Sequence, residues 1–187
     1  MQDLLLFLLL AVLLFWCVGA FNRLTRLRAV IEARFAALDE VLMRYLGWVQ
    51  SLLPAELQAG GALAGADDAH WLRLRAALDQ YFAALARARR TPREATAMDA
   101  LVLAHNALAP AWDAVVHSKT LTRDEVALAQ LKERRSRLLS QSVPLRDAFN
   151  DAVAAYNQAV GQFPALLLAR LFGFRRAGNM LKLGLDA

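Results

Sequence analysis

An uninterrupted apolar run at residues 4–21 constrains the fold of this chain more than any other feature. It reads LLLFLLLAVLLFWCVGAF and contains neither a charged residue nor a proline. As a helix, its ~18 residues would extend ~27 Å, which is enough to cross the hydrocarbon core of a bilayer. Because a helix satisfies its own backbone hydrogen bonds in lipid, we predict a transmembrane anchor at residues 1–21.

Two other interpretations of this run are a cleaved signal peptide and a lipidated cysteine. A signal peptide has a basic start, whereas the first three residues, MQD, include an acidic one. A lipid-attachment site needs small residues before the cysteine, and Phe15 and Trp16 precede Cys17. The sequence therefore favours an uncleaved anchor over both.

The charges beside the run predict its orientation. Arg23, Arg26 and Arg28 follow it closely, and Asp3 is the only charge before it. By the positive-inside rule, the N-terminus should lie outside and the chain from Asn22 onward in the cytoplasm. The formal net charge of +5 favours an acidic partner surface, with anionic lipid headgroups ahead of nucleic acid.

Apolar residues recur at three- and four-residue spacing through most of the remaining chain, which is typical of helices that pack on one another. Residues 22–53 follow the run without a helix breaker, so one rod of ~50 residues and ~75 Å is expected. The glycine-rich residues 54–66 are predicted to be a loop. Further helices are expected from Asp67 or Asp68 to about Arg90, from Thr91 onward, and from Thr122 to about Phe163.

These segments predict an all-α fold, in which a single N-terminal transmembrane helix continues into an elongated antiparallel four-helix bundle at residues 22–164. Thr91 and Glu94 have the spacing of a capping box, with Pro92 at the first helical position. Thr122 to Glu125 repeat that pattern. Pro110 and Pro144 should bend or interrupt the third and fourth helices.

Residues 165–187 form a separate C-terminal tail that is apolar at first and then basic. Residues 165–174 read ALLLARLFGF, and two arginines follow. This stretch could insert shallowly at the membrane interface or fold back over the base of the bundle. The last residues, 177–187, show no clear pattern and are expected to be loose.

Two stretches of the chain match the sequence pattern of a known protein family. The matching residues near the C-terminal end are Phe149, Asn150, Val153, Tyr156, Asn157, Phe163, Pro164, Ala169, Gly173 and Phe174. Those after the apolar run are Phe21, Asn22, Leu24, Leu27, Arg28, Val30, Phe35, Leu38, Asp39, Leu42 and Arg44. With these residues the chain resembles the LemA family, which implies a single-pass protein of the bacterial inner membrane with a cytoplasmic helical bundle and no established reaction. Trp48, Val49 and Gln50 stand where the family usually has a proline-asparagine-leucine turn.

Asn150 and Asn157 are seven residues apart, so they should share one helix face beside the apolar residues. They could fix the helix register through interhelical hydrogen bonds, or they could contact a partner, and we favour the first interpretation. Asn22 could belong to the same layer. His70, His105 and His117 show no metal-ligand spacing.

If the four helices alternate in direction, three basic clusters should meet at the membrane surface. These clusters comprise Arg23, Arg26, Arg28, Arg87, Arg89, Arg90, Arg170, Arg175 and Arg176. An anionic leaflet would attract them, although each cluster could instead merely solvate a helix end. Arg134, Arg135 and Arg137 form a further basic group that could bind a partner.

The sequence contains no nucleophile elbow, phosphate-binding loop or dinucleotide motif. We therefore expect no catalytic, cofactor or metal site. The predicted function is a non-enzymatic, membrane-anchored helical scaffold or interaction protein of the LemA type, which meets an unidentified protein partner or another copy of itself. The alternative is a basic membrane protein that tethers nucleic acid; a hydrolase ranks last.

Overall fold

The computed structural model describes residues 2–59, 68–118, 121, 124–162 and 165–180, and all of its regular structure is helical. The helices are α1 (Gln2–Ser51), α2 (Ala55–Gln58), α3 (Asp68–Arg90), α4 (Ala95–His117), α5 (Glu125–Gly161) and α6 (Ala165–Leu171). The predicted all-α class is therefore confirmed for the described residues.

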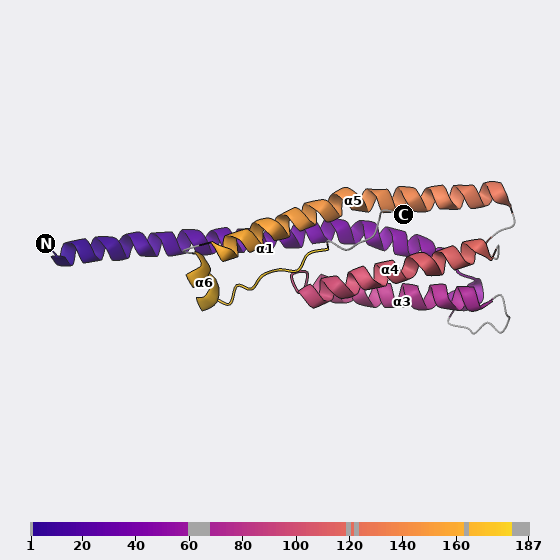
Figure 1. Ribbon diagram of the computed structural model, residues 1–187, viewed down its shortest axis with the longest axis horizontal. Helices are drawn as coiled ribbons and strands as arrows, with labels where there is room; N and C mark the ends of the chain where they lie inside the picture. The colour runs from indigo at the N-terminus through magenta and orange to yellow at the C-terminus, as the bar shows by residue number, and fades with distance from the viewer. Residues whose placement is uncertain (1, 60–67, 119–120, 122–123, 163–164, 181–187) are drawn as a thin grey trace.

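Helix α1 is continuous across the junction at Asn22, as the missing helix breaker predicted. Its first part extends beyond the rest of the molecule (Figure 1). Most of the large apolar side chains between Leu4 and Phe21 are exposed, Phe15 at 84%, and Trp16 is partly exposed, whereas Leu24 and Ile31 are buried. The structure thus contains one helix near the N-terminus that is long and apolar enough to span a membrane.

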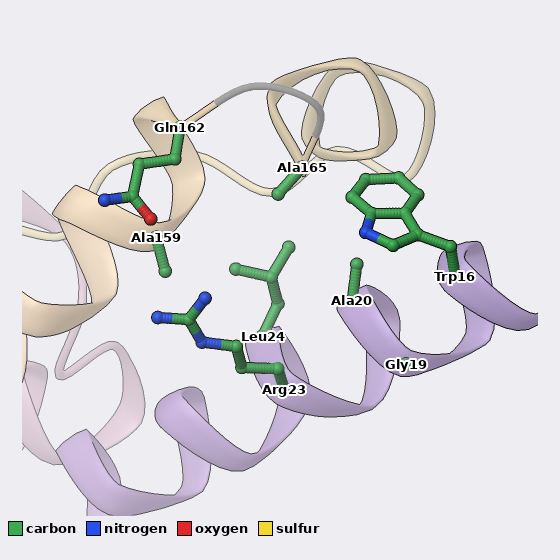
Figure 2. Close-up of a pocket in the computed structure, with 8 residues that line it drawn as sticks. All are labelled: Trp16, Gly19, Ala20, Arg23, Leu24, Ala159, Gln162 and Ala165. Carbon is green, nitrogen blue, oxygen red and sulfur yellow. The ribbon is translucent and has the colours of Figure 1, made fainter. Parts of the chain in front are cut away.

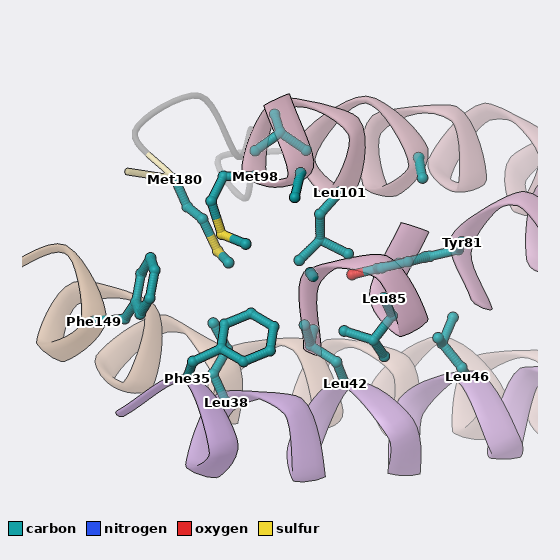
Figure 3. Packing of buried hydrophobic residues seen from close by; sticks show 14 of the residues in the cluster. Phe35, Leu38, Leu42, Leu46, Tyr81, Leu85, Met98, Leu101, Phe149 and Met180 are labelled. Carbon is teal, nitrogen blue, oxygen red and sulfur yellow. The ribbon is translucent and has the colours of Figure 1, made fainter. Parts of the chain in front are cut away.

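The four long helices lie in two pairs, α1 with α5 and α3 with α4, and α1 also contacts α3. In Figure 1, α1, α3, α4 and α5 alternate in direction along one long axis. A single core joins the pairs, and Leu38 of α1, Leu85 of α3, Leu101 of α4 and Phe149 of α5 all contribute to it (Figure 3).

The N-terminal half of α5, which is farther from the apolar segment, is less well covered by other helices than its periodicity predicted. A groove of about 540 Å³ separates it from α4. As a result Leu128, Leu131, Leu138 and Leu145 are only partly buried, whereas Phe149, Val153, Tyr156 and Val160 are buried.

The prediction that α4 starts at Thr91 is wrong, because the backbone N–H of Thr91 is hydrogen-bonded to the last turn of α3. The Thr91 N–H donates to the Arg87 carbonyl at 3.2 Å, and Glu94 N–H donates to the Thr91 carbonyl at 3.0 Å. Residues 91–94 therefore form a turn, and α4 begins at Ala95. Hydrogen bonds, first from Thr96 and then from Thr91, hold the pKa of Glu94 below its usual value.

Two other local predictions also need correction, and the prediction that Pro144 bends or interrupts its helix is confirmed as a bend. The predicted loop at 54–66 contains the short helix α2, whose Leu57 is buried, and residues 60–67 lie outside the described residues. Helix α5 begins at Glu125 with Asp124 as its cap, the side chain accepting from Val126 N–H at 2.9 Å. Pro144 does not interrupt α5, which only changes direction near its middle (Figure 1).

Candidate functional site

Helix α6 folds back against α1 where the exposed apolar segment ends. The Phe21 ring lies edge-on to the rings of Phe172 and Phe174, with centroids 5.4 and 5.7 Å apart. Gly173 has a φ of 68°, and the Phe174 N–H donates to the Ala169 carbonyl at 2.8 Å. This is a Schellman-type helix end, which requires the left-handed conformation that glycine adopts without strain.

The segment after α6 is extended and is held by three side chains of α5. Asn157 binds both backbone groups of Ala177: its Oδ1 accepts from the N–H at 2.7 Å, and its Nδ2 donates to the carbonyl at 2.9 Å. Asn150 Oδ1 accepts from Met180 N–H at 2.8 Å, and the Tyr156 hydroxyl donates to the Arg175 carbonyl at 3.0 Å. We call these contacts of Asn150, Tyr156 and Asn157 the clasp.

The spacing of the clasp follows from helix and strand geometry. Seven residues of a helix rise ~10.5 Å, and three residues of extended chain cover ~10 Å. The two asparagines can therefore bind Ala177 and Met180 together. The favoured prediction of interhelical hydrogen bonds is wrong, since the partner is the chain's own C-terminal segment, which was expected to be loose. Asn22 is exposed on α1.

Beyond the clasp, the extended segment fills the space between the two helix pairs. Gly178 N–H donates to the Arg93 carbonyl at 3.0 Å, and a Cβ on Gly178 would collide with the backbone of Ala95. Met180 is fully buried, and Figure 3 shows it beside Met98 and Phe149. Two features of the sequence could have indicated this packing, the pair Asn150 and Asn157 and the glycine at position 178. The C-terminal segment itself has no helical or strand periodicity.

Six of the predicted membrane-surface arginines occupy α1 just after the apolar segment, or α6 and the residues after it. We call Arg23, Arg26, Arg28, Arg170, Arg175 and Arg176 the basal arginines. Residues 4–31 and 152–180 contain no Asp or Glu, so nothing within these stretches offsets their charge. Arg28 lies 3.8 Å from the Phe174 ring centroid and donates to the Tyr156 hydroxyl at 3.3 Å, which ties α1 to the clasp.

The other three predicted arginines lie farther along the molecule, and two of them pair with acidic side chains. Arg89 Nε is 2.8 and 2.9 Å from the two carboxylate oxygens of Asp39, and Arg87 pairs with Glu94 at 3.1 Å. Arg90 donates to the Ala86 carbonyl at 3.4 Å. Since Asp39 is 18 residues after Phe21, this group lies ~27 Å beyond the apolar segment along α1.

The groove between α4 and α5 holds a buried histidine. His105 Nδ1 and the Tyr81 hydroxyl form a hydrogen bond of 2.9 Å. Burial lowers the pKa of His105 to about 4, and the charges of Arg135 and Arg146 act in the same direction. Burial also raises the pKa of Tyr81. Near pH 7 this pair is therefore neutral.

Arg135 of the basic group on α5 lines the same groove, and two of the three arginines in this group pair with acidic side chains. Arg135 donates to the Tyr45 hydroxyl at 3.4 Å and lies 4.0 Å from Asp113. Its guanidinium also lies 5.6 Å from the Trp112 centroid. Arg134 lies over Trp48, and Arg137 pairs with Glu133. The described residues contain no group of three or more side chains that could hold a metal ion.

Several of the residues that resemble the LemA family have structural roles. Phe149 packs edge-on against Phe35 at 5.8 Å, Asn150, Tyr156 and Asn157 form the clasp, and Asp39 pairs with Arg89. Gly173 and Phe174 form the turn after α6, whereas Asn22 is exposed. Phe163 and Pro164 lie outside the described residues. Comparisons with protein-family models, curated proteins and solved structures found no match, so the family resemblance stays a prediction.

Proposed function

We propose that this chain is a single-pass scaffold or interaction protein of the bacterial inner membrane, of the LemA type and without chemistry of its own. One observation carries the proposal. An apolar helix whose large side chains are mostly exposed continues without a break into a packed helical body, and the six basal arginines cluster at the junction. A bilayer has this same order of layers, from hydrocarbon to anionic headgroup to water.

The exposed apolar segment needs a cover, and lipid is the cover that fits it. Each large apolar side chain left in water forgoes about 1.5–3 kcal/mol of burial free energy. Leu4, Phe7, Leu9 and Phe15 are all at least 69% exposed and point around the helix in different directions. A protein groove would cover one face only, whereas hydrocarbon surrounds the whole helix.

The arginines set the orientation of the proposed anchor. Basic residues near a spanning helix stay on the cytoplasmic side, and each contributes ~1 kcal/mol at an anionic surface. The helical body therefore lies in the cytoplasm, with Gln2 on the outer side. We propose that it acts as an elongated antiparallel four-helix bundle, whose α1 rod carries the distal end ~45 Å from the membrane. That distal end meets a protein partner or another copy of this chain.

The alternative of nucleic-acid tethering has less support. It draws on the arginine-rich residues 87–93, but Arg87, Arg89 and Arg93 face Glu94, Asp39 and Glu32. Binding to nucleic acid needs cationic side chains that can neutralise phosphates and displace their counterions, and arginines already paired with carboxylates are poorly suited to that.

Cysteine labelling in spheroplasts tests the proposed topology. In a Cys17→Ala background, we would compare Gln2→Cys with Gln130→Cys, which lies on the exposed face of distal α5. A membrane-impermeant maleimide should label position 2 in intact spheroplasts and position 130 only after lysis. Labelling of position 130 from outside would refute the orientation. Release of the chain by alkaline carbonate would refute the anchor itself.

A further inference from the structure

A pocket lies where the apolar segment meets the helical body. It has a volume of about 390 Å³ and is bounded by α1, the end of α5 and the start of α6 (Figure 2). Trp16, Gly19, Ala20 and Arg23 of α1 line it together with Ala159 and Gln162. Under the proposed topology it is at the depth where hydrocarbon gives way to headgroups.

The pocket has one apolar wall and one polar wall. Figure 2 shows the Trp16 indole on one side, and the Arg23 guanidinium and the Gln162 amide on the other. Trp16 precedes Arg23 by seven residues, or ~10 Å along the helix, so the indole lies deeper in the apolar segment. A ligand that spans both walls must therefore be apolar at one end and polar at the other.

The polar wall carries the positive charge of Arg23, and no described acidic side chain pairs with it. Arg176 does not line the pocket, but its Nη2 lies 3.5 Å from where a Cβ on Gly161 would be, and it also makes no ion pair with any described side chain. This places the Arg176 guanidinium beside the residue that precedes Gln162, near the edge of the pocket. Two guanidinium groups and an amide are strong donors for a phosphate group.

We propose that this pocket binds the headgroup of one anionic phospholipid. Arg23, Arg176 and Gln162 donate hydrogen bonds to the phosphodiester, and the first acyl carbons lie against Trp16 and Ala20. A free phosphate ion would leave that apolar wall uncovered, so the lipid is the ligand that fits both walls. The inference rests on the proposed membrane anchoring.

Tryptophan quenching by brominated lipid tests the site on the full chain. Trp16 is the only tryptophan in the apolar segment, whereas Trp48, Trp71 and Trp112 are buried in the helical body. In phosphatidylcholine nanodiscs, brominated phosphatidylglycerol should quench Trp16 more strongly than brominated phosphatidylcholine does. We expect the preference to be about fivefold, the factor that a basic residue at an anionic surface supports.

Matched variants separate a pocket from general surface charge. R23Q should abolish most of the preference, whereas R26Q removes an equal charge from the same end of α1 but not from the pocket. G19L should also abolish it by filling the pocket, since a Cβ at Gly19 meets nothing within 4 Å. G47L is the control, because Gly47 is equally open but lies in the helical body.

The outcomes distinguish this inference from the anchoring on which it rests. If neither lipid quenches Trp16, the chain is not inserted, and both proposals fail. If both lipids quench it equally, or if R26Q costs as much as R23Q, the anchor stands and the lipid site is refuted. Competition by inorganic phosphate would show an ion site in place of a lipid site.

Discussion

At the scale of single residues, His105 should make the stability of the protein depend on pH. Its pKa is 6.5 in the unfolded chain and about 4 in the folded one, because burial disfavours the charged ring. The unfolded state binds the extra proton between these values, so folding stability falls as the pH drops from 6.5 to 4. Over this whole pH range the free energy of unfolding should fall by ~3 kcal/mol. Urea unfolding of the detergent-solubilised chain at several pH values measures it.

Two variants assign this pH dependence. His105→Asn keeps an acceptor near the Nδ1 position for Tyr81 but cannot titrate, so its stability should change much less over this range. His117→Gln should keep the dependence, because His117 is exposed and the change leaves His105 in place. A steep acid loss that persists in His105→Asn would point to another group.

A second residue-scale prediction concerns Gly178. Gly178→Ala should detach the C-terminal segment from α4, because the added Cβ would collide with the Ala95 backbone, which cannot move aside as a side chain can. Faster tryptic cleavage after Arg175 and Arg176 would report the detachment. Gly47→Ala should instead stabilise α1 by ~1 kcal/mol, since Gly47 is an exposed helical glycine. Unchanged cleavage in Gly178→Ala would show that the segment can shift.

At this scale, periodicity predicted which side chains are buried but not what the polar ones bind. Leu38, Tyr81, Leu101 and His105, which lie at helical spacing with other apolar residues, are all buried. The helical period also placed Asn150 and Asn157 on one face. Their partner could not be predicted, because an extended segment held by its backbone leaves no side-chain pattern.

At the scale of elements, the clasp should be an important support of the C-terminal segment. Asn157→Ala removes two hydrogen bonds and leaves the half-buried Ala177 backbone groups without that partner. We expect a loss of about 1–3 kcal/mol in the free energy of unfolding and faster hydrogen exchange at Ala177. Asn179→Ala is the control, since Asn179 is exposed in the same segment. Equal effects in the two variants would contradict the clasp.

Helix starts show why element boundaries were harder to predict than the elements. Thr91 and Thr122 both begin a threonine-to-glutamate spacing. At Thr91 the preceding helix takes the N–H, and the spacing gives a turn. At the second site Asp124, two residues later, is the cap, and Thr122 lies outside the described residues. A local pattern fails where a neighbouring element competes for the same backbone groups.

At the scale of the whole molecule, alternation in direction followed from four long helices joined by short connections. The pairing of α1 with α5 and of α3 with α4 could not be predicted from the sequence, because any of the four apolar faces could pack against any other. The pairing matters because it leaves a space between the two helix pairs on the side of the apolar segment. The buried side chains of Phe174, Ala177 and Met180 fill that space.

Removing the C-terminal segment should therefore uncouple the two helix pairs. Truncation after Leu171 removes three buried side chains and all four clasp hydrogen bonds, whereas truncation after Met180 keeps both sets. Burial of a methionine or phenylalanine alone contributes about 1.5–3 kcal/mol, so the shorter chain should lose several kcal/mol of coupling. Hydrogen exchange measures the loss of backbone protection separately for each helix. In the shorter chain, the amides at the start of α4 and the end of α3 should exchange faster, while those of α1 between Ile31 and Leu46 should be affected less. Uniform loss of protection along all helices would mean that the segment supports global folding, and unchanged exchange in α3 and α4 would mean that their contacts with α1 suffice.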